Sequence, residues 1–521
     1  MNRAQMSEQT GFSSASKASA RDDDAAPRRE RPATNWGGNV SLTQARELRE
    51  PSSVAAVAEL VAAAAAGPAV TPVRAIGAAH SASTILQTRG VLLRLRRLQR
   101  IRPVDPRRCR SDVAAERLFE VDAGVSVRAL NEFLARRGLT LPMTGAFTGM
   151  TYVGAVSTAT HGSGIDHPPM CAQLRAVTVV DGTGRVLRIE PRDGCSTSSG
   201  HARAEPRCTL IQDDRWFRSV AVGLGCAGVI TSVTIEAVPA LYLEERRTRT
   251  SWRDVRETLT RVDANSGHPR DLRGSYSYEF VVNPYRLPRR RERTAVVKRR
   301  VRSTSCTCPA GATPPEGFRV NKSLVRAVDL LANRMRIRSI IPRSIEGALR
   351  QIPTRGARWG PAHELLGGVA ELPRGYSIEL ALPMEAVTRA LDTLIDVLED
   401  ARARDGWMLS GWMAVRFVAG ARAYMAMSAG DEPRCFVEFL TLASNRHIGG
   451  LFERLTEVGL SLGARPHWGQ HLATPIQGLA RLYPDYPAWR RVIDEINSTR
   501  VFDGPFLRGL SAAQQRDQES A

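Results

Sequence analysis

The chain has 521 residues, of which 43% are hydrophobic and 24% charged, and its formal net charge is +20 at pH 7. This composition is typical of a globular protein with two or three domains and excludes a fibrous or wholly disordered chain. Only Lys17, Lys298 and Lys322 are lysines, and arginines spread along the chain supply the other basic residues. The charge excess therefore favours a solvated basic surface, with a nucleic-acid-binding protein as the open alternative.

Residues 1–34 are polar and lack an apolar stretch of signal-peptide length, so we expect a disordered N-terminal segment. The eight cysteines form no C-x-x-C pair, which predicts reduced thiols and neither a zinc site nor another metal site. The most apolar run, Val54 to Gly67, contains Glu59 and is too short to span a bilayer. We therefore expect a cytoplasmic protein without a transmembrane segment, and peripheral contact with a membrane stays open.

From Asn35 onward the patterns predict alternating helices and strands. Ser53 precedes an alanine-rich helix that ends at Gly67, and Asp181-Gly182-Thr183-Gly184 marks the turn of a hairpin. Apolar alternation and β-branched runs predict the strands. The expected elements are a strand over 70–76, a strand over 91–101, a strand and helix over 118–142, a hairpin over 174–190 and a strand over 226–240.

After Ala240 the chain changes to strand-like segments that alternate with longer helices. Residues 296–317 are basic and then rich in Cys, Pro, Gly and Thr, so they are interpreted as an exposed insertion. The fold class is α+β, and four regions are expected: a disordered segment at 1–34, a first domain at 35–240, a second domain at 241–462 and a C-terminal segment at 463–521. The other expected elements are strands over 276–287, 375–383, 412–420 and 434–443 and helices over 384–406 and 448–462.

Three stretches of small residues suggest a ligand laid along backbone loops. In RAIGAAHSAS, Gly77, Ala78 and Ala79 follow a strand and precede His80, so backbone N–H groups there can approach a phosphate. The spacing matches neither G-x-G-x-x-G nor a P-loop. Similar stretches occur at 151–164 and 222–235. Together they predict one long ligand held by several loops of the first domain.

The stretches IGAAHSAS, LPMTGAFTGMTYVGAVSTATHGSG and GLGCAGVITSVTIEAVP resemble the FAD-contacting stretches of the vanillyl-alcohol oxidase (PCMH) type of flavoprotein. NWGGN and RPHWGQ are similar to its sugar-oxidising branch, the aldonolactone oxidases and alditol oxidase. The resemblance covers roughly residues 35–483. It implies an FAD-binding domain of two α/β subdomains over 35–240, a substrate domain with an antiparallel sheet flanked by helices over 241–462, and a C-terminal segment that returns to the flavin.

The same resemblance implies that His80 is bonded covalently to the 8α-methyl carbon of FAD. Ala79 stands where the family usually has glycine, and alanine still leaves the backbone accessible. Cys171 is interpreted as an ordinary small residue rather than a second attachment site. The residues expected to contact FAD are Gly77, Ala78, Ala79, His80, Ser81, Gly154, Ser157, Thr158, Thr160, His161, Gly162, Gly164, Val229 and Ile230.

Two positions depart from what the resemblance implies for the chemical site. Relatives place a Glu-x-Arg pair and the Lys of a His-Trp-x-Lys motif beside flavin and substrate, whereas this chain has Ala414 before Arg416 and Gln470 after His467. Arg416, Gln470 and His467 are the expected catalytic residues, and His467, His471 or Arg416 is expected to supply the positive charge that the lysine gave. Glu379 and Glu438 are candidate substitutes for the missing carboxylate, although a surface or paired carboxylate is the plainer interpretation of each.

The predicted function is an FAD-dependent oxidoreductase that oxidises a CH–OH group of a small molecule, with O2 as the expected acceptor and dehydrogenase activity left open. The two departures favour a less polar alcohol, as in specialised metabolism, over sugar lactones and alditols. Two alternatives stay open: a basic nucleic-acid-binding protein, and a flavin-binding protein without turnover.

Overall fold

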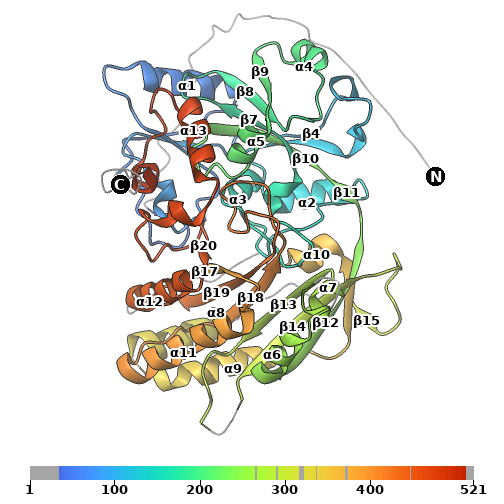
Figure 1. Cartoon of the computed structure of the whole chain (residues 1–521), viewed down its shortest axis with the longest axis vertical. Coiled ribbons are helices and arrows are strands. Elements are labelled where there is room, and N and C mark those ends of the chain that lie inside the picture. The colour runs from blue at the N-terminus through green and yellow to red at the C-terminus, as the bar shows by residue number, and fades with distance from the viewer. Residues whose placement is uncertain are drawn as a thin grey trace, which may run out of the picture.

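The computed structural model describes residues 34–263, 267–288, 292–315, 322–335, 337–369, 374–445 and 448–511. Apart from Thr34, the segment expected to be disordered lies outside these residues. Figure 1 shows two parts stacked along the long axis: the sheets of the N-terminal half lie above a broad antiparallel sheet with helices on its lower side. The chain is thus mixed α+β, as the sequence predicts.

A small parallel sheet opens the first part, with strand order β1 (Glu47–Arg49), β3 (Val91–Arg94), β2 (Val73–Ile76). Helix α1 (Val54–Ala66) begins after Ser53, whose side chain accepts a hydrogen bond from the Ala56 N–H. The alternating run over 91–101 is not one strand, because β3 ends at Arg94 and the next strand belongs to a different sheet.

A six-stranded sheet forms the rest of the first part, and it includes the hairpin expected over 174–190. The strand order is β4 (Ile101–Pro103), β5 (Leu118–Asp122), β10 (Val229–Glu236), β7 (Leu174–Val180), β8 (Val186–Glu190), β9 (Cys208–Gln212). Its helices are α2 (Val127–Ala135), α3 (Tyr152–Ser157), α4 (Ser198–Ala204) and α5 (Asp214–Ala221), and β6 (Leu139–Thr140) pairs with β11 (Val238–Pro239).

A nine-stranded sheet forms the second part, and it is largely antiparallel. The strand order is β15 (Ala312–Thr313), β16 (Ala357–Pro361), β12 (Tyr242–Ser251), β14 (Thr294–Arg302), β13 (Ser277–Val282), β18 (Met413–Val418), β19 (Arg434–Leu442), β17 (Gly375–Pro383), β20 (Arg465–Pro466). Its helices are α6 (Trp252–Thr260), α7 (Arg270–Arg273), α8 (Lys322–Val328), α9 (Ile341–Gln351), α10 (Ala362–Leu366), α11 (Val387–Asp405) and α12 (Ile448–Ser461).

Strand alternation gives this sheet one apolar and one charged face. Phe280, Val415 and Phe439 point to the face that packs in one core with α6, α11 and α12. Their chain neighbours Glu279 and Glu438 point to the opposite face, toward the first part, because successive side chains of a strand alternate. A charged face that a second part of the molecule covers is a place for a polar ligand.

Residues 294–302 are not part of an exposed insertion. They form β14, which pairs with β12 on one side and β13 on the other, and Ala295 and Val296 are fully buried. Of the basic residues that suggested exposure, Arg300 is buried, Lys298 is half-buried and both line the cavity. A run of positive charge in sequence is therefore no evidence of solvent exposure when a cavity lies on one face of a sheet.

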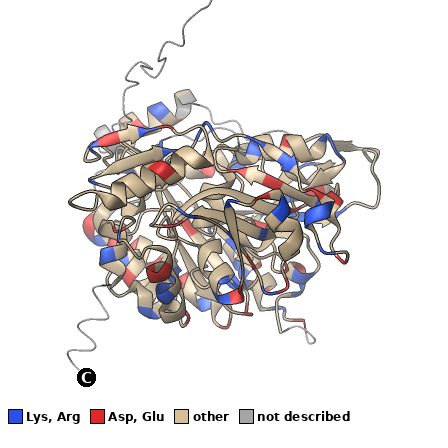
Figure 2. Ribbon diagram, turned by 90° about the horizontal axis from the view of Figure 1, so that it is seen from above, with Lys and Arg blue, Asp and Glu red and all other residues tan. Residues whose placement is uncertain are grey.

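The C-terminal helix α13 (Tyr486–Ile496) packs on α5, and the indole N–H of Trp489 donates to the Val222 carbonyl at 3.3 Å. None of the helices among the described residues is long and apolar enough to cross a membrane. Basic and acidic residues are interspersed over the ribbon rather than gathered on one side (Figure 2).

Candidate functional site

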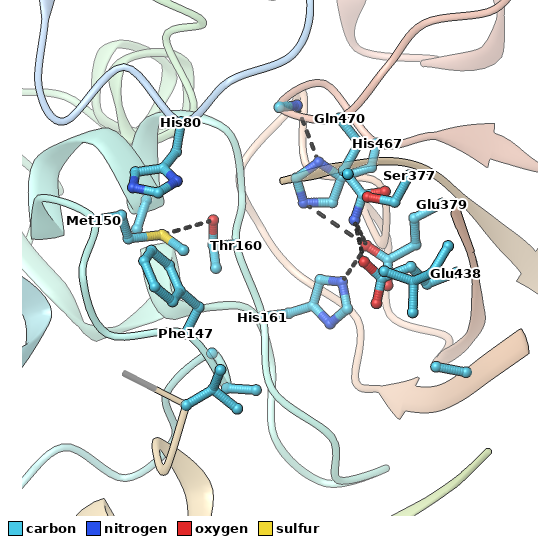
Figure 3. A pocket seen from close by; sticks show the side chains of 18 of the residues that line it. His80, Phe147, Met150, Thr160, His161, Ser377, Glu379, Glu438, His467 and Gln470 are labelled. Atoms are coloured by element: carbon cyan, nitrogen blue, oxygen red, sulfur yellow. Dashed lines mark hydrogen bonds and ion pairs between the residues drawn. The ribbon is translucent and has the colours of Figure 1, made fainter. Parts of the chain in front are cut away.

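A single cavity of about 1270 Å³ lies between the loops of the first part and the charged face of the nine-stranded sheet. This volume exceeds the usual range of about 300–1,000 Å³ for a site that holds one small molecule. In Figure 3, His80, Phe147 and Met150 lie on one side, and Gln470, His467, Glu379 and Glu438 lie on the other. The cavity has room for a large cofactor together with a second ligand.

The loop after β2 forms a wall of this cavity through its backbone. Residues 77–81 all line it, and a side chain at Gly77 would overlap the hydroxyl oxygen of Thr151. The backbone N–H groups of Ala78, Ala79, His80 and Ser81 donate to no acceptor within the part of the chain that the structure describes. Four successive N–H groups without a protein acceptor beside a cavity fit an anionic ligand such as a pyrophosphate.

Ala79 is held in the left-handed region with φ +55°, where glycine is favoured. Its carbonyl accepts a hydrogen bond from the Trp36 N–H at 2.9 Å, and the Ser81 carbonyl accepts one from the Asn35 amide. The segment NWGGN therefore stabilises the conformation of this loop. A left-handed backbone favours glycine, and alanine, with its single methyl group, is the smallest other residue that can stand there.

Replacing Ala79 by valine is expected to lower FAD occupancy of the purified protein sharply. A β-branched side chain adds strain at φ +55° and crowds the unpaired N–H groups. Ala79→Gly is the matched control, and we expect it to keep full occupancy because it relaxes the same backbone. The ratio of flavin to protein absorbance measures both variants. Full occupancy in Ala79→Val would contradict the assignment of this loop to the pyrophosphate.

His80 faces the cavity between two aromatic rings. Its imidazole stacks on Trp36 with ring centroids 5.1 Å apart and meets Phe147 at 4.7 Å. Within the described residues neither ring nitrogen has a hydrogen-bond partner. Burial lowers the pKa of His80 to about 4, so the ring is neutral at pH 7 and keeps a free nitrogen lone pair.

The second small-residue stretch runs from α3 into an extended loop. Gly154, Ser157, Thr158, Thr160 and His161 line the cavity, as does Ile230 of β10. Three further residues expected to contact FAD do not line the cavity: Gly162, Gly164 and Val229.

Gly162 and Gly164 have a different role from the one expected. A side chain at Gly162 would collide with Met143, and one at Gly164 would collide with the Tyr276 carbonyl. The Gly164 N–H donates to the Phe417 carbonyl of β18. These two glycines allow the first part of the molecule to approach the nine-stranded sheet closely, so they shape the cavity without lining it.

Glu379 of β17 is the centre of the polar cluster at the other side. One carboxylate oxygen lies 3.1 Å from Arg416 Nη1, and the other lies 3.3 Å from His161 Nε2 and 3.1 Å from Gln470 Nε2. Burial alone would raise the pKa of this carboxyl, but the charge and hydrogen bond of His161 and the charge of Arg416 hold it below its usual range. Glu379 is therefore an ionised carboxylate whose oxygens are already occupied by donors.

Glu438 of β19 supplies the carboxylate that is missing at Ala414. The two residues are direct cross-strand partners, so their side chains emerge side by side on the cavity face. Glu438 Oε2 lies 2.9 Å from Arg416 Nη1. Like Glu379, Glu438 is paired, as one of the sequence interpretations held, yet it also lines the cavity. A carboxylate on the strand next to Ala414 therefore faces Arg416.

Gln470 is oriented by the two carboxylates. Its amide nitrogen donates to Glu379 Oε2 at 3.1 Å and to Glu438 Oε1 at 3.3 Å, and its amide oxygen is buried without a partner in the described structure. Both amide hydrogens are therefore used within the protein.

His467 is buried, and its Nδ1 accepts the Gly469 N–H at 3.0 Å. Its proton is therefore on Nε2, which faces Glu379 Oε2 at 4.0 Å. Burial lowers the pKa of His467 to about 4, and burial also lowers the pKa of His471, which does not line the cavity. Of the three residues expected to supply positive charge, only Arg416 brings a cation to the cavity at neutral pH.

His161, Glu379 and His467 place three potential metal-ligand atoms within 4.8 Å of one another. Arg416 and Gln470 already donate to the Glu379 oxygens, and a guanidinium beside a cation is unfavourable. Hydrogen bonds therefore account for this cluster without a metal.

Sequence reasoning missed the charged residues of the more distant strands. Glu279 of β13, Lys298 and Arg300 of β14, and Glu245 and Arg247 of β12 all line the same cavity. The sequence held one indication of this charged face: Lys298 is one of three lysines in a chain whose other basic residues are arginines. Strand pairing and alternation decide which of the many arginines face inward, and neither can be read locally.

Comparison with known proteins agrees with this geometry. A family model described as FAD binding domain matches residues 46–190, and one described as D-arabinono-1,4-lactone oxidase matches residues 233–510, more than half of the chain. The chain is 26% identical over 477 residues to L-gulono-1,4-lactone dehydrogenase of Mycobacterium tuberculosis, covering 91% of this chain and 98% of that protein. It is 25% identical over 482 residues to alditol oxidase of a Streptomyces species, covering 92% and 98%.

Among solved structures, cholesterol oxidase from B. sterolicum superposes with a TM-score of 0.70 at 14% sequence identity, covering 92% of this chain and 96% of that one. At this identity the likeness concerns the fold, which is the α+β flavoprotein fold that the motifs predicted.

Proposed function

Because the chain belongs to the D-arabinono-1,4-lactone oxidase family and carries an FAD-binding domain, we propose that it oxidises a CH–OH group of a small polyhydroxylated molecule. The observation that carries the proposal is the shared cavity, in which unpaired N–H groups at 78–81 lie opposite the carboxylates Glu379 and Glu438. One side suits the phosphates of a dinucleotide, and the other suits hydroxyl groups.

The residues present fit FAD. Residues 77–81 would hold the pyrophosphate, and Ser157, Thr158 and Thr160 would line the flavin and its side chain. The free nitrogen lone pair of His80 supports a covalent bond from the imidazole to the 8α carbon of the flavin. When bound, FAD supplies the hydride acceptor at its N5 atom, and O2 is the proposed final oxidant.

Glu438 is the residue best placed to accept the substrate hydroxyl proton. Each of its oxygens has one protein donor, Arg416 or Gln470, whereas Glu379 is more deeply buried and has three. His467 cannot serve as the acceptor in the tautomer found, because Gly469 occupies its Nδ1. Arg416 helps to keep Glu379 ionised, contacts Glu438 at 2.9 Å and presents positive charge to the cavity.

The missing carboxylate at 414 was the reason to expect a less polar alcohol. Since Glu438 restores a carboxylate beside Arg416, the cavity again suits a substrate with several hydroxyl groups. We therefore favour a sugar-derived alcohol or lactone over an apolar alcohol. Bleaching of the flavin under anaerobic conditions during a screen of polyols, sugar lactones and apolar alcohols tests this function. Bleaching by apolar alcohols alone would overturn the substrate class.

Replacing Gln470 by lysine is expected to raise the flavin reduction potential by about 30 mV. An ammonium between Glu379 and Glu438 adds a positive charge to the cavity wall, which stabilises the reduced, anionic flavin through space, and about 1.4 kcal/mol of such stabilisation corresponds to about 30 mV for a two-electron couple. Gln470→Met is the neutral control, and it should not raise the potential. Redox titration and the affinity of the flavin for sulfite measure the effect. An unchanged potential in Gln470→Lys would show that the carboxylates insulate position 470 from the flavin.

A further inference from the structure

The charged face of the sheet continues well beyond the residues proposed to react. Arg416 is the direct cross-strand partner of Glu279, Glu279 of Lys298, and Lys298 of Arg247, so these side chains form one row across β18, β13, β14 and β12. Residues of all four strands in this row line the cavity. Neighbouring strands are about 4.8 Å apart, so Lys298 lies roughly 14 Å from Glu438 at the level of the backbone.

At the far end of this row, three cations share two carboxylates. Lys298 Nζ lies 3.2 Å from Glu279, and Arg300 bridges Glu279 at 3.1 Å and Glu245 at 2.7 Å. Arg247 donates to Glu245 through Nε at 2.6 Å. The cations therefore outnumber the carboxylates by one at this end of the row, whereas at the other end two carboxylates, Glu379 and Glu438, share Arg416. A local excess of positive charge in a half-buried setting is costly.

The unbalanced charge faces the cavity. Arg247 and Lys298 are like charges directly opposite each other on paired strands, an arrangement that is destabilising by itself. Within the described residues, the two terminal nitrogens of Arg247 have no partner, and Lys298 Nζ contacts Glu279 alone. Their remaining N–H donors are free for a ligand. An anion between the two side chains would remove the repulsion and fill those donors.

Apolar side chains form part of the opposite wall at this end. Val328 of α8 and Ala348 of α9 line the cavity there, and Arg249 donates to the Leu349 and Ile352 carbonyls at the end of α9. This contact holds α9 over the same face of β12 that carries Arg247, because residues 247 and 249 share a face. Charges under an apolar cover bind an anion more strongly than the same charges in water do.

We propose that Arg247 and Lys298 form a subsite for an anionic group, a carboxylate or a phosphate, at the end of an elongated polyhydroxylated substrate. The inference rests on the proposed function for the position of the reacting hydroxyl, at Glu438. The distance between Lys298 and Glu438 corresponds to a substrate of about disaccharide length rather than a single five- or six-carbon sugar. The proposal assigns recognition of the substrate's charged end to β12 and β14, the two strands of the row that lie farthest from Glu438.

Isothermal titration of the holoprotein with lactobionate and with its uncharged counterpart lactitol tests the subsite without requiring turnover. We expect lactobionate to bind about 10-fold more tightly at low salt, and this preference to fall to less than 2-fold in Lys298→Gln and in Arg247→Gln. Lys298→Arg should keep it. Arg246→Gln is the matched control, because Arg246 lies on the same strand, points to the opposite face and pairs with Glu244.

Competition by acetate and by inorganic phosphate separates the two kinds of anion, since the better competitor identifies the group that the subsite prefers. Equal affinity for lactobionate and lactitol, a preference that survives in Lys298→Gln, or no Lys298-dependent anion binding at all would overturn the proposal. Failure of the proposed function has a different signature: the anion still binds in a Lys298-dependent manner, but no polyhydroxylated compound bleaches the flavin. Melting temperatures of all variants confirm that they are folded.

Discussion

Acid-denatured holoprotein is expected to keep its flavin in the protein pellet, and His80→Ala is expected to release all of it or to yield apoprotein. The imidazole lies on the cofactor loop beside Trp36, and its nitrogens have no partner in the described structure. A covalent bond survives unfolding, whereas every contact from the backbone of residues 77–81 is lost with the fold. Absorbance of pellet and supernatant near 450 nm measures the effect.

The control for this experiment is His471→Ala. His471 is also largely buried and accepts or donates one hydrogen bond with Asn39, but it does not line the cavity, so its loss should leave the flavin in the pellet. Flavin in the supernatant of the unmodified protein would disprove covalent attachment. Because the unpaired N–H groups would remain, that result alone would leave non-covalent FAD binding intact.

The attachment reaction should also have a characteristic pH dependence. Burial lowers the pKa of His80 to about 4, so the neutral ring with its free lone pair persists as the pH falls from 8 to 5. A histidine with the ordinary pKa of about 6.5 would be about three quarters protonated at pH 6. Apoprotein mixed with FAD should therefore attach flavin equally well at pH 8 and pH 6 and lose this capacity only near pH 4. A decline centred on pH 6.5 would contradict the buried, neutral state of His80.

The same low pKa predicts a cost in stability for the apoprotein. The unfolded chain binds a proton at His80 and His467 below pH 6.5, whereas the folded chain binds it only near pH 4. These two groups therefore do not reduce the free energy of unfolding above pH 6.5, and they reduce it progressively as the pH decreases from 6.5 to 4.

The loop proposed to hold the cofactor could be recognised in the sequence because its requirement is local. A backbone that must approach an anion needs small residues in succession, and Gly77, Ala78 and Ala79 show that need within three positions. The free N–H groups and the left-handed Ala79 then appear in the structure at the same place. The exceptions, Gly162 and Gly164, have small residues for another reason, which is close packing between the two parts of the molecule.

The substrate side could be predicted only in part, because its residues come from strands far apart in the chain. The motifs identify Arg416 and Gln470, and they show that Ala414 stands where a carboxylate was expected. Only strand register shows that Glu438 stands directly beside that position and that both carboxylates hold the amide of Gln470. The row from Arg416 to Arg247 depends on three strand pairings, and no local pattern encodes it.

Replacing Arg416 by glutamine is expected to reduce the rate of flavin reduction by about 10²–10³-fold. Arg416 Nη1 lies 3.1 Å from Glu379 and 2.9 Å from Glu438, and Nε lies 3.8 Å from Glu279. Without the guanidinium, these carboxylates lose their shared cation, and at least one takes up a proton to avoid mutual repulsion. A protonated Glu438 cannot accept the substrate proton. Stopped-flow reduction of the flavin at saturating substrate measures the chemical step directly.

The pH profile separates this electrostatic effect from a simple loss of packing. In the unmodified protein Arg416 helps to hold the pKa of Glu379 below its usual range, so this carboxylate stays ionised at acidic pH. In Arg416→Gln the pKa of Glu379 rises, and activity should disappear at a higher pH as the solution is acidified and recover in part at alkaline pH. Arg416→Lys keeps a positive charge but not the two-sided reach of the guanidinium, and its profile should lie between the two.

Arg256→Gln is a control for the loss of an arginine from this part of the molecule, since Arg256 pairs with Asp392 among the helices on the opposite face of the sheet. It should leave both rate and pH profile unchanged. Removing one partner of a buried ion pair costs about 3–5 kcal/mol of stability, so flavin content and melting temperature are measured for each variant. If a folded, flavin-loaded Arg416→Gln protein reduced its flavin at the original rate with an unshifted acid limb, Arg416 would be a structural residue. The proton acceptor would then have to be ionised by other groups, of which His161 is the nearest to Glu379.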